Sequence, residues 1–540
     1  MEPAARRGGG NVREESYRPR RGFLYSRYVA NEDQRIDVVE QGWRLPVVVL
    51  GVLLAPLLET IDSSIVNVAL PTIQGNLGAT LDQAAWVVTA YIIANVIVIP
   101  LTPWMQSRFG RRQYFAATIV GFTVVSVLCG TAGSIEQLIV YRVLQGLFGG
   151  GLIATAQVTL RDTFPPEQVG ASQGLFAIVI LIGPIVAPMI GGVIVDNLSW
   201  QWIFFINLVP GAAAAFIIAT MLRNPTRPRV LPVDALGVAF LAVGLGSLQF
   251  ILDEGERRDW YNSVEIQLAT FAAIAGLIAF AVWELRGTSR PIVDLRVLRY
   301  RAVAAGSLIA IGTAATIFGT ILVLPQYTQN VLGFTAYDSG FLLLFRALPV
   351  MLLTPVVAGL VGSGRLDARP VMAAGFLLAG IGSLMQVGVT TSETGFWTLV
   401  LPLFIAGLGG SMLFIPLLIT VQSTTPPNEA PQASALITLA FQLGGSIAGA
   451  IAVTLIDRRA DLHLDTLAGT ANAARIPVQQ FLDTHQSVGQ LFSAIVTQAQ
   501  TLAFADEAWL LGIAALCIIP IAFMMPRQPR DLSGVEIEAG

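Results

Sequence analysis

Long apolar segments recur along this chain of 540 residues, and each is long enough to span a lipid bilayer. Only 12% of the residues are charged, which is about half the share found in ordinary soluble domains. Backbone groups inside a bilayer must be hydrogen-bonded within the protein, and these segments lack the strict alternation of a transmembrane β-barrel. The sequence therefore predicts an all-α polytopic membrane protein.

Fourteen transmembrane helices are predicted, in the order six, two and six. The first eight cover residues 46–70, 83–105, 113–132, 137–160, 170–195, 201–222, 233–252 and 266–285, and the last six cover 302–326, 339–361, 370–390, 397–422, 433–456 and 507–526. This order divides the chain into a disordered cytoplasmic arm (1–44), an N-terminal six-helix half (45–222), two linker helices (223–300), a C-terminal six-helix half (301–526) with an external loop at 457–506, and a cytoplasmic tail (527–540). Two such halves are typical of transporters whose site lies near the bilayer midplane.

The positions of the basic residues orient these helices. All 32 basic residues are arginines. With the N-terminus inside, 25 of them fall in cytoplasmic segments and five fall outside, as the positive-inside rule requires. The remaining two, Arg142 and Arg346, lie within predicted helices. We therefore expect both termini to be cytoplasmic.

Cysteine and histidine give no indication of a metal site. Cys129 and Cys517 fall in apolar segments, and His463 and His485 fall in a polar stretch. The sequence contains no P-loop motif for binding nucleotides. We therefore expect no metal and no cofactor, and a membrane enzyme or sensor ranks last among the functional alternatives.

The first predicted helix carries two carboxylates on one face. Glu59 and Asp62 are three residues apart, and Asp62 lies roughly 25 Å along the helix at 1.5 Å per residue. A carboxylate at this depth costs about 2.5–3.5 kcal/mol to insert, so its default interpretation is a functional site. Arg142 lies at a matching depth, and its pair with Asp62 would be either a proton-controlled switch or a static salt bridge. Glu59 would be a second titrating group or would attract cationic cargo.

Three further features each have functional and purely structural interpretations. Arg346 would gate an external pathway or contact an anionic substrate, or else extend its side chain to the outer interface. The segment LIGPIVAPMIGG (181–192) would be a hinge between the halves or a site of tight packing. The turn RFGRR (108–112) would be a charge clamp that closes the inner face, or charge that only orients the protein.

Polar and aromatic side chains in otherwise apolar helices are candidates for lining a cargo cavity. They are Asn67, Gln145, Phe176, Gln326, Arg346, Phe414, Gln422 and Gln442. The polar ones would alternatively form hydrogen bonds between neighbouring helices.

Several of these segments together resemble the major facilitator superfamily, and within it the fourteen-helix drug:proton antiporters of the EmrB/QacA type. DSSIVNVALP (62–71) is similar to the first-helix motif, with Asp62 at its acidic position, and YRVLQG (141–146) is similar to the fourth-helix motif, with Arg142 at its arginine. GPIVAPMIGG is similar to the antiporter motif, with Gly183, Pro184, Pro188, Gly191 and Gly192 in register and Ala187 in place of a glycine. The loop motif is matched at Arg108, Gly110, Arg111 and Arg112, but Pro103 and Ser107 replace its usual glycine and aspartate. WQWIFFIN (200–207), LDEGERRDW (252–260) and RPIVDL (290–295) resemble the EmrB type in particular.

The resemblance implies an exporter of amphipathic toxic compounds in the bacterial inner membrane, driven by the proton gradient without a cofactor. Asp62, Arg142 and Glu59 would then couple proton movement to alternating access between the two halves. In a host with an outer membrane, proteins of this type work with a periplasmic adaptor (EmrA-like) and an outer-membrane channel (TolC-like), and the loop at 457–506 would be a candidate docking site. Proton-linked export of an endogenous metabolite, such as an antibiotic, a siderophore or a lipid precursor, remains an alternative on the sequence alone.

Overall fold

A computed structural model describes residues 40, 42–165, 168–224, 234–288, 291, 293–426, 429–471, 478–481 and 487–528. Within these residues, fourteen helical segments are long and apolar enough to cross a bilayer, which confirms the predicted number and the all-α class. Most of the predicted arm (1–44) and of the predicted tail (527–540) lies outside the described residues.

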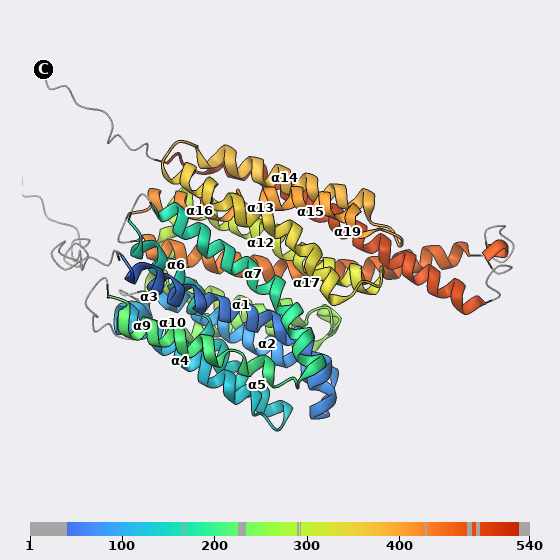
Figure 1. The fold of residues 1–540 in the computed structure, drawn as a ribbon, viewed down its shortest axis with the longest axis horizontal. Helices are drawn as coiled ribbons and strands as arrows, with labels where there is room; N and C mark the ends of the chain where they lie inside the picture. The colour runs from blue at the N-terminus through green and yellow to red at the C-terminus, as the bar shows by residue number, and fades with distance from the viewer. Residues whose placement is uncertain are drawn as a thin grey trace, which may run out of the picture.

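The first half, taken as residues 44–221, contains six of these candidate membrane segments and is drawn in blue to green in Figure 1. Its elements are α1 (Arg44–Leu77), α2 (Leu81–Val98), η3 (Ile99–Leu101), α3 (Thr102–Phe109), α4 (Arg111–Gly130), α5 (Ile135–Gly149), α6 (Leu152–Thr163), α7 (Val169–Asn197), α8 (Trp202–Phe205) and α9 (Leu208–Met221). Buried aromatic side chains such as Phe115 and Phe122 fill the space between them.

The second half is drawn in yellow to red in Figure 1. Its elements are α12 (Arg301–Asn330), α13 (Ala336–Gly362), α14 (Ala368–Val389), α15 (Phe396–Gly410), α16 (Phe414–Thr424), α17 (Ala430–Thr470) and α19 (Val488–Met524). Between the halves the chain forms α10 (Ala235–Glu254), η5 (Trp260–Asn262), α11 (Val264–Val282), the π-helical turn η6 (Trp283–Gly287) and η7 (Leu295–Arg299).

Polar residues explain where several of these helices begin. Thr80 and Gln83 form a capping box at the start of α2, and Thr335 and Asp338 form another at the start of α13. The side chain of Ser134 accepts a hydrogen bond from the first turn of α5. Such caps satisfy backbone donors that the helix itself leaves unpaired.

The fourth membrane segment of each half is broken in a glycine-rich stretch. The first half breaks between α5 and α6, and the second half breaks between α15 and α16. Just before each break a glycine packs against the second segment of the same half: Gly146 lies on the backbone of α2, and Gly407 lies on the backbone of α13. The two halves therefore share a structural detail. Interrupted helices at matching positions are a feature of transporter binding sites.

The two halves meet along α7 and α13, and the linker helix α10 also lies at their junction. On one side, Phe250 of α10 stacks on Trp86 of α2 with ring centres 5.5 Å apart. On the other side, Gln249 Nε2 donates a hydrogen bond to Ser446 Oγ of α17 at 2.9 Å. The linker helix therefore bridges the first and second halves.

The described part of the segment predicted as an external loop, 457–506, is mostly helical. Helix α17 continues to Thr470, and α19 already begins at Val488. The two helices pack against each other and extend beyond the rest of the bundle, at the right of Figure 1. Asp506 joins them, because Arg459 Nε lies 2.6 Å and His463 Nε2 lies 2.8 Å from its Oδ2 atom. Hydropathy indicates where apolar sequence ends, whereas these helices continue into polar sequence.

Candidate functional site

A buried ion pair joins α1 and α5. Arg142 Nη1 lies 2.5 Å from Asp62 Oδ2, and both side chains are fully buried. An isolated charge in such a place would cost several kcal/mol, and a direct partner of opposite sign offsets much of this cost. The structure thus brings together the two charges whose depths match in the sequence.

Two amide side chains complete the surroundings of Asp62. Gln145 Nε2, one turn along α5 from Arg142, donates to Asp62 Oδ1 at 2.9 Å. Asn207 Nδ2, at the start of α9, donates to the same oxygen at 2.9 Å and to Ser126 Oγ at 3.0 Å. Both carboxylate oxygens of Asp62 therefore accept hydrogen bonds, one from Arg142 and the other from the two amides.

Arg142 also has contacts that do not depend on the charge of Asp62. Its Nε donates to the Val87 carbonyl oxygen of α2 at 3.0 Å, and its guanidinium lies 4.1 Å from the centre of the Tyr91 ring. Its Nη1 donates to Gln145 Oε1 at 2.7 Å. A carbonyl, an aromatic face and an amide would therefore still hold the guanidinium if Asp62 were neutral.

Glu59 lies outside this network, beside the break between α5 and α6. Asn95 Nδ2 of α2 donates to Glu59 Oε1 at 2.7 Å, and the backbone N–H of Ile153 donates to Oε2 at 3.2 Å. Ile153 is in the first turn of α6, where a negative charge is favoured by the helix dipole. Since Glu59 is only 6% exposed, its visible role is to connect α1 with α2 and α6, and in this conformation it is not open to cargo.

The glycines of the LIGPIVAPMIGG segment differ in how closely they approach α1. An added Cβ at Gly183 would collide with the Thr60 side chain and come within 3.2 Å of its backbone carbonyl carbon. An added Cβ at Gly191 would lie 2.8 Å from Ile65 Cγ1, whereas no described atom lies within 4 Å of one at Gly192. The two prolines of the segment lie inside the continuous helix α7. Tight packing on α1 is therefore visible at Gly183 and Gly191, but not at Gly192.

The RFGRR turn lies between α3 and α4 along the chain, and it contacts the end of α6. Arg111 Nη1 lies 2.7 Å from Asp162 Oδ2. Gly110 has φ = 86°, a backbone conformation that favours glycine. The backbone N–H of Arg112 donates to Asn224 Oδ1 at 2.8 Å. The turn thus forms one ion pair within the first half.

The positions at which the turn departs from the family motif make local contacts. Pro103 lies in the first turn of α3, where its missing N–H is tolerated. Ser107 Oγ donates to the carbonyl oxygen of Trp104 at 2.8 Å. Arg108 lies over the Phe109 ring, 5.9 Å from its centre. Any charge clamp at this turn therefore depends on Arg111 rather than on residue 107.

Arg346 is bonded to α12 within the second half. Its Nη2 donates to the Thr316 carbonyl oxygen at 2.5 Å, and its Nη1 donates to Thr320 Oγ1 at 3.1 Å. The side chain is 6% exposed. These bonds argue against the interpretation that Arg346 extends to the outer interface.

The remaining predicted cavity residues differ in how deeply they are buried. Phe176 is buried, Phe414, Gln422 and Gln442 are partly buried, and Asn67 and Gln326 are exposed. Gln422 Nε2 donates to Ser434 Oγ of α17 at 3.1 Å. This is a hydrogen bond between helices, which was the alternative to lining a cavity. Phe414 packs on Phe441 with ring centres 4.4 Å apart. Gln145, which the sequence also suggested for the cavity, instead belongs to the Asp62 network.

Four functional candidates were not indicated by the sequence: Asn95, Ser126, Asp162 and Asn207. Asn95, Ser126 and Asn207 each lie within a predicted membrane helix and form hydrogen bonds to another helix. A polar side chain in an apolar helix is the available signal, but many such residues are present. Their partners become apparent only once the helices are placed side by side.

Comparisons with known proteins agree with this architecture. The family model described as Major Facilitator Superfamily matches residues 52–449. The chain is 34% identical to the multidrug export protein EmrB of Escherichia coli (strain K12), over 80% of this chain and 84% of the relative. It is 32% identical to the fatty acid resistance protein FarB of Neisseria gonorrhoeae, over 90% and 96% of the two chains. It is 30% identical to the probable multidrug resistance protein EmrY of Escherichia coli (strain K12), over 92% and 98%.

Solved structures show the same fold at low sequence identity. The proton:xylose symporter XylE matches with a TM-score of 0.56 and 13% identity, covering 89% of this chain and 96% of the symporter chain. An inward-facing, unoccupied bacterial homologue of the lysosomal transporter Spinster matches with a TM-score of 0.55 and 16% identity, covering 90% and 98% of the two chains.

Proposed function

This chain belongs to the major facilitator superfamily, where it is EmrB-like, and we propose that it is a multidrug exporter driven by proton exchange. Relatives that are multidrug export proteins match most of its length. The observation that carries the proton coupling is the fully buried Asp62, whose carboxylate is paired with Arg142 and bonded by two amides. An ionisable residue inside a membrane span is a functional site by default.

Protonation of Asp62 would change the contacts between three elements. The ionised carboxylate holds α5 through Arg142 and Gln145, and it holds the start of α9 through Asn207. A proton from outside removes the charge and weakens the pair, while Arg142 keeps its contacts with α2. The loosened helices release cargo outward, and loss of the proton to the inside restores the pair. Alternating access between the halves follows from these two states.

The proton gradient supplies enough free energy for useful export. One proton that crosses 100 mV supplies about 2.3 kcal/mol. At about 1.4 kcal/mol per tenfold change, this supports roughly a fifty-fold gradient of a neutral compound.

The proposed cargo is amphipathic, and long-chain carboxylic acids are included among the compounds to be tested. One relative is a fatty acid resistance protein, and others are multidrug export proteins. Export of an endogenous metabolite remains the second candidate. A fatty acid or lipid precursor made by the cell is amphipathic, as the proposed toxic cargo is. A compound panel that includes both classes distinguishes them by their transport rates.

We further propose a location in the bacterial inner membrane, with both termini cytoplasmic. In that orientation, the parts of α17 and α19 that extend beyond the bundle in Figure 1 would lie outside the cell membrane. They are the proposed docking region for a periplasmic adaptor that leads to an outer-membrane channel. Deletion of the extensions would then lower export from intact cells while leaving transport into vesicles unchanged.

The deciding experiment uses purified protein in liposomes with a pH-sensitive dye. Addition of cargo is expected to cause proton movement opposite to cargo movement, and a pH gradient is expected to drive cargo uphill. Cargo movement that is unaffected by collapse of the pH gradient would contradict the proposal.

A charge exchange tests the ion pair at the RFGRR turn. Arg111 lies at the N-terminus of α4, and Asp162 lies in the last turn of α6, which are unfavourable ends for charges of these signs. Their mutual pairing therefore explains their presence. We expect Arg111→Asp and Asp162→Arg each to lower the transport rate several-fold, because a partly exposed pair contributes about 1 kcal/mol or less.

The double variant Arg111→Asp/Asp162→Arg keeps the local net charge and places each charge at a favourable helix end. It is expected to recover most of the transport rate in a dye-efflux assay. A double variant as slow as the single variants would show that the two residues do not act as a pair.

A further inference from the structure

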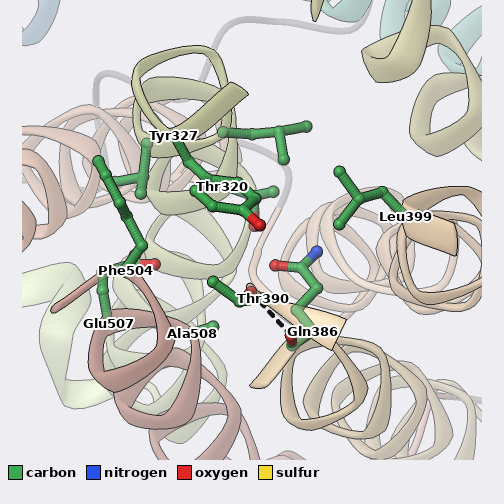
Figure 2. A pocket seen from close by; sticks show the side chains of 10 residues that line it. Thr320, Tyr327, Gln386, Thr390, Leu399, Phe504, Glu507 and Ala508 are labelled. Atoms are coloured by element: carbon green, nitrogen blue, oxygen red, sulfur yellow. Dashed lines mark hydrogen bonds between the residues drawn. The ribbon is translucent and has the colours of Figure 1, made fainter. Parts of the chain in front are cut away.

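A second buried carboxyl group lies in the second half of the protein, on α19. Glu507 is 4% exposed, and its Oε1 atom has no hydrogen-bond partner among the described residues. It lines a small pocket with Tyr327 of α12, Gln386 of α14 and Thr390, which follows α14. Figure 2 shows these side chains around the pocket. Buried Nε2 of Gln386 also lacks a partner among the described residues, so a donor and an acceptor line one pocket, both unsatisfied.

The positive charge that acts on Glu507 is Arg346 of α13. Arg346 and Glu507 do not form a direct ion pair among those described. The guanidinium of Arg346 instead donates to Thr316 and Thr320 of α12. Thr320 itself lines the pocket of Glu507. The guanidinium is therefore bonded at the edge of the pocket.

The other titratable groups near Glu507 are already engaged. The Tyr327 hydroxyl donates to the Thr391 carbonyl oxygen at 2.6 Å. On α17, Arg459 and His463 bond to Asp506, the neighbour of Glu507 along α19. From α14, the pocket receives the uncharged Gln386. Among the described residues, Arg346 is thus a charged partner that Glu507 could bind.

The buried carboxyl groups of the two halves differ in their hydrogen-bond donors and charged neighbours. Asp62 has an ion pair and two amide donors, an arrangement that suits a carboxylate. Glu507 has a buried oxygen to which no described residue donates, and an ionised carboxylate left in that condition is costly. In the same conformation, donors surround the carboxyl group of Asp62, whereas none of the described residues donates to Glu507 Oε1, which makes Glu507 the carboxyl group better suited to carry a proton.

We propose that Glu507 is a second proton-binding group of the transport cycle, which takes up its proton from outside before Asp62 does. The proton bonds to a carboxylate oxygen on the pocket side and leaves to the inside after the halves have turned. Arg346 then exchanges its bond to Thr320 for the ionised carboxylate. The inference rests on the proposed proton exchange. It predicts that two protons are exchanged for each cargo molecule that is exported.

Counting protons per cargo molecule in liposomes tests this proposal. Glu507→Gln is expected to lower the count by one, because a neutral amide cannot carry a proton. The largest cargo gradient should fall by roughly fifty-fold for each 100 mV of membrane potential, while downhill transport continues. The control Asp506→Asn removes the adjacent carboxylate, which is bonded to α17, and it should leave the count unchanged.

The outcomes separate this inference from the proposed function. If the unaltered protein moves no protons with cargo, the proposed function fails. If it does move protons and Glu507→Gln gives the same count, the role of Glu507 is overturned and the proposed function stands. Should Glu507→Gln fail to fold, Glu507→Asp keeps a carboxyl group and is expected to keep the count while shifting the pH midpoint of transport. An unshifted midpoint or a lowered count in this variant would also overturn the proposal.

Discussion

Replacement of Asp62 by asparagine is expected to abolish proton-driven export while the protein still folds in the membrane. The amide has nearly the shape of the carboxyl group and can still accept hydrogen bonds from Gln145 and Asn207. It cannot bind and release a proton, so proton movement is no longer linked to alternating access. The cargo gradient that proton exchange supports, roughly fifty-fold for each proton at 100 mV, is therefore lost. Liposome uptake under a pH gradient measures this loss, and downhill exchange without a gradient should persist.

The expectation that the Asp62→Asn variant still folds follows from the proposed mechanism. Loss of one partner of a buried ion pair typically costs about 3–5 kcal/mol, because a charge is left uncompensated. A carrier that protonates Asp62 in each cycle must nevertheless tolerate a neutral group there. The bonds of Arg142 to Val87 and Gln145, and its contact with Tyr91, provide this tolerance.

A double variant distinguishes a proton switch from a static salt bridge. Asp62→Asn/Arg142→Gln removes both charges and keeps polar side chains of similar size. If the pair only holds two helices together, this neutral variant should transport nearly as well as the unaltered protein. The switch predicts that it is stable but remains uncoupled from the pH gradient. Uphill transport by the double variant would therefore contradict our mechanism.

The pairing of Asp62 with Arg142 could be predicted because both are charges inside long apolar segments. Counting residues gives the depth of each charge, and matching depth favours pairing. Depth says nothing about which way a helix is turned, so the contacts of Asn207 and Ser126 could not be predicted in the same way. Gln145 shows the same limit, since its depth suits both a cargo cavity and the network in which the structure places it.

The ends of the last two helices illustrate a different limit. Apolar sequence ends near residue 456 in α17 and begins near residue 507 in α19, but the helices continue through polar sequence to Thr470 and from Val488. Hydropathy predicts where lipid contact ends, whereas a helix persists as long as its backbone bonds and packing are favourable. Hydropathy therefore predicts Glu507 at the first residue of the last membrane helix, whereas the structure places it well inside α19.

A methyl group added at Gly183 is expected to impair both folding stability and transport. An added Cβ there would collide with the Thr60 side chain of α1 and approach the backbone behind it, so α7 must move away. Overpacking of this kind costs about 1–3 kcal/mol. We expect Gly183→Ala to lower the unfolding temperature and to slow liposome transport by about tenfold, since 1.4 kcal/mol corresponds to a factor of ten.

Gly192→Ala provides the matched control on the same helix, because no described atom lies within 4 Å of an added Cβ there. Alanine favours a helix over glycine by about 0.8–1.0 kcal/mol, so this variant should be as stable as the unaltered protein or slightly more so. Its transport rate separates the two interpretations of the segment. If the glycines serve as a hinge, added stiffness at residue 192 should slow transport as much as the change at residue 183 does. If close packing on α1 is their role, only Gly183→Ala should be slow, and this is the result we expect.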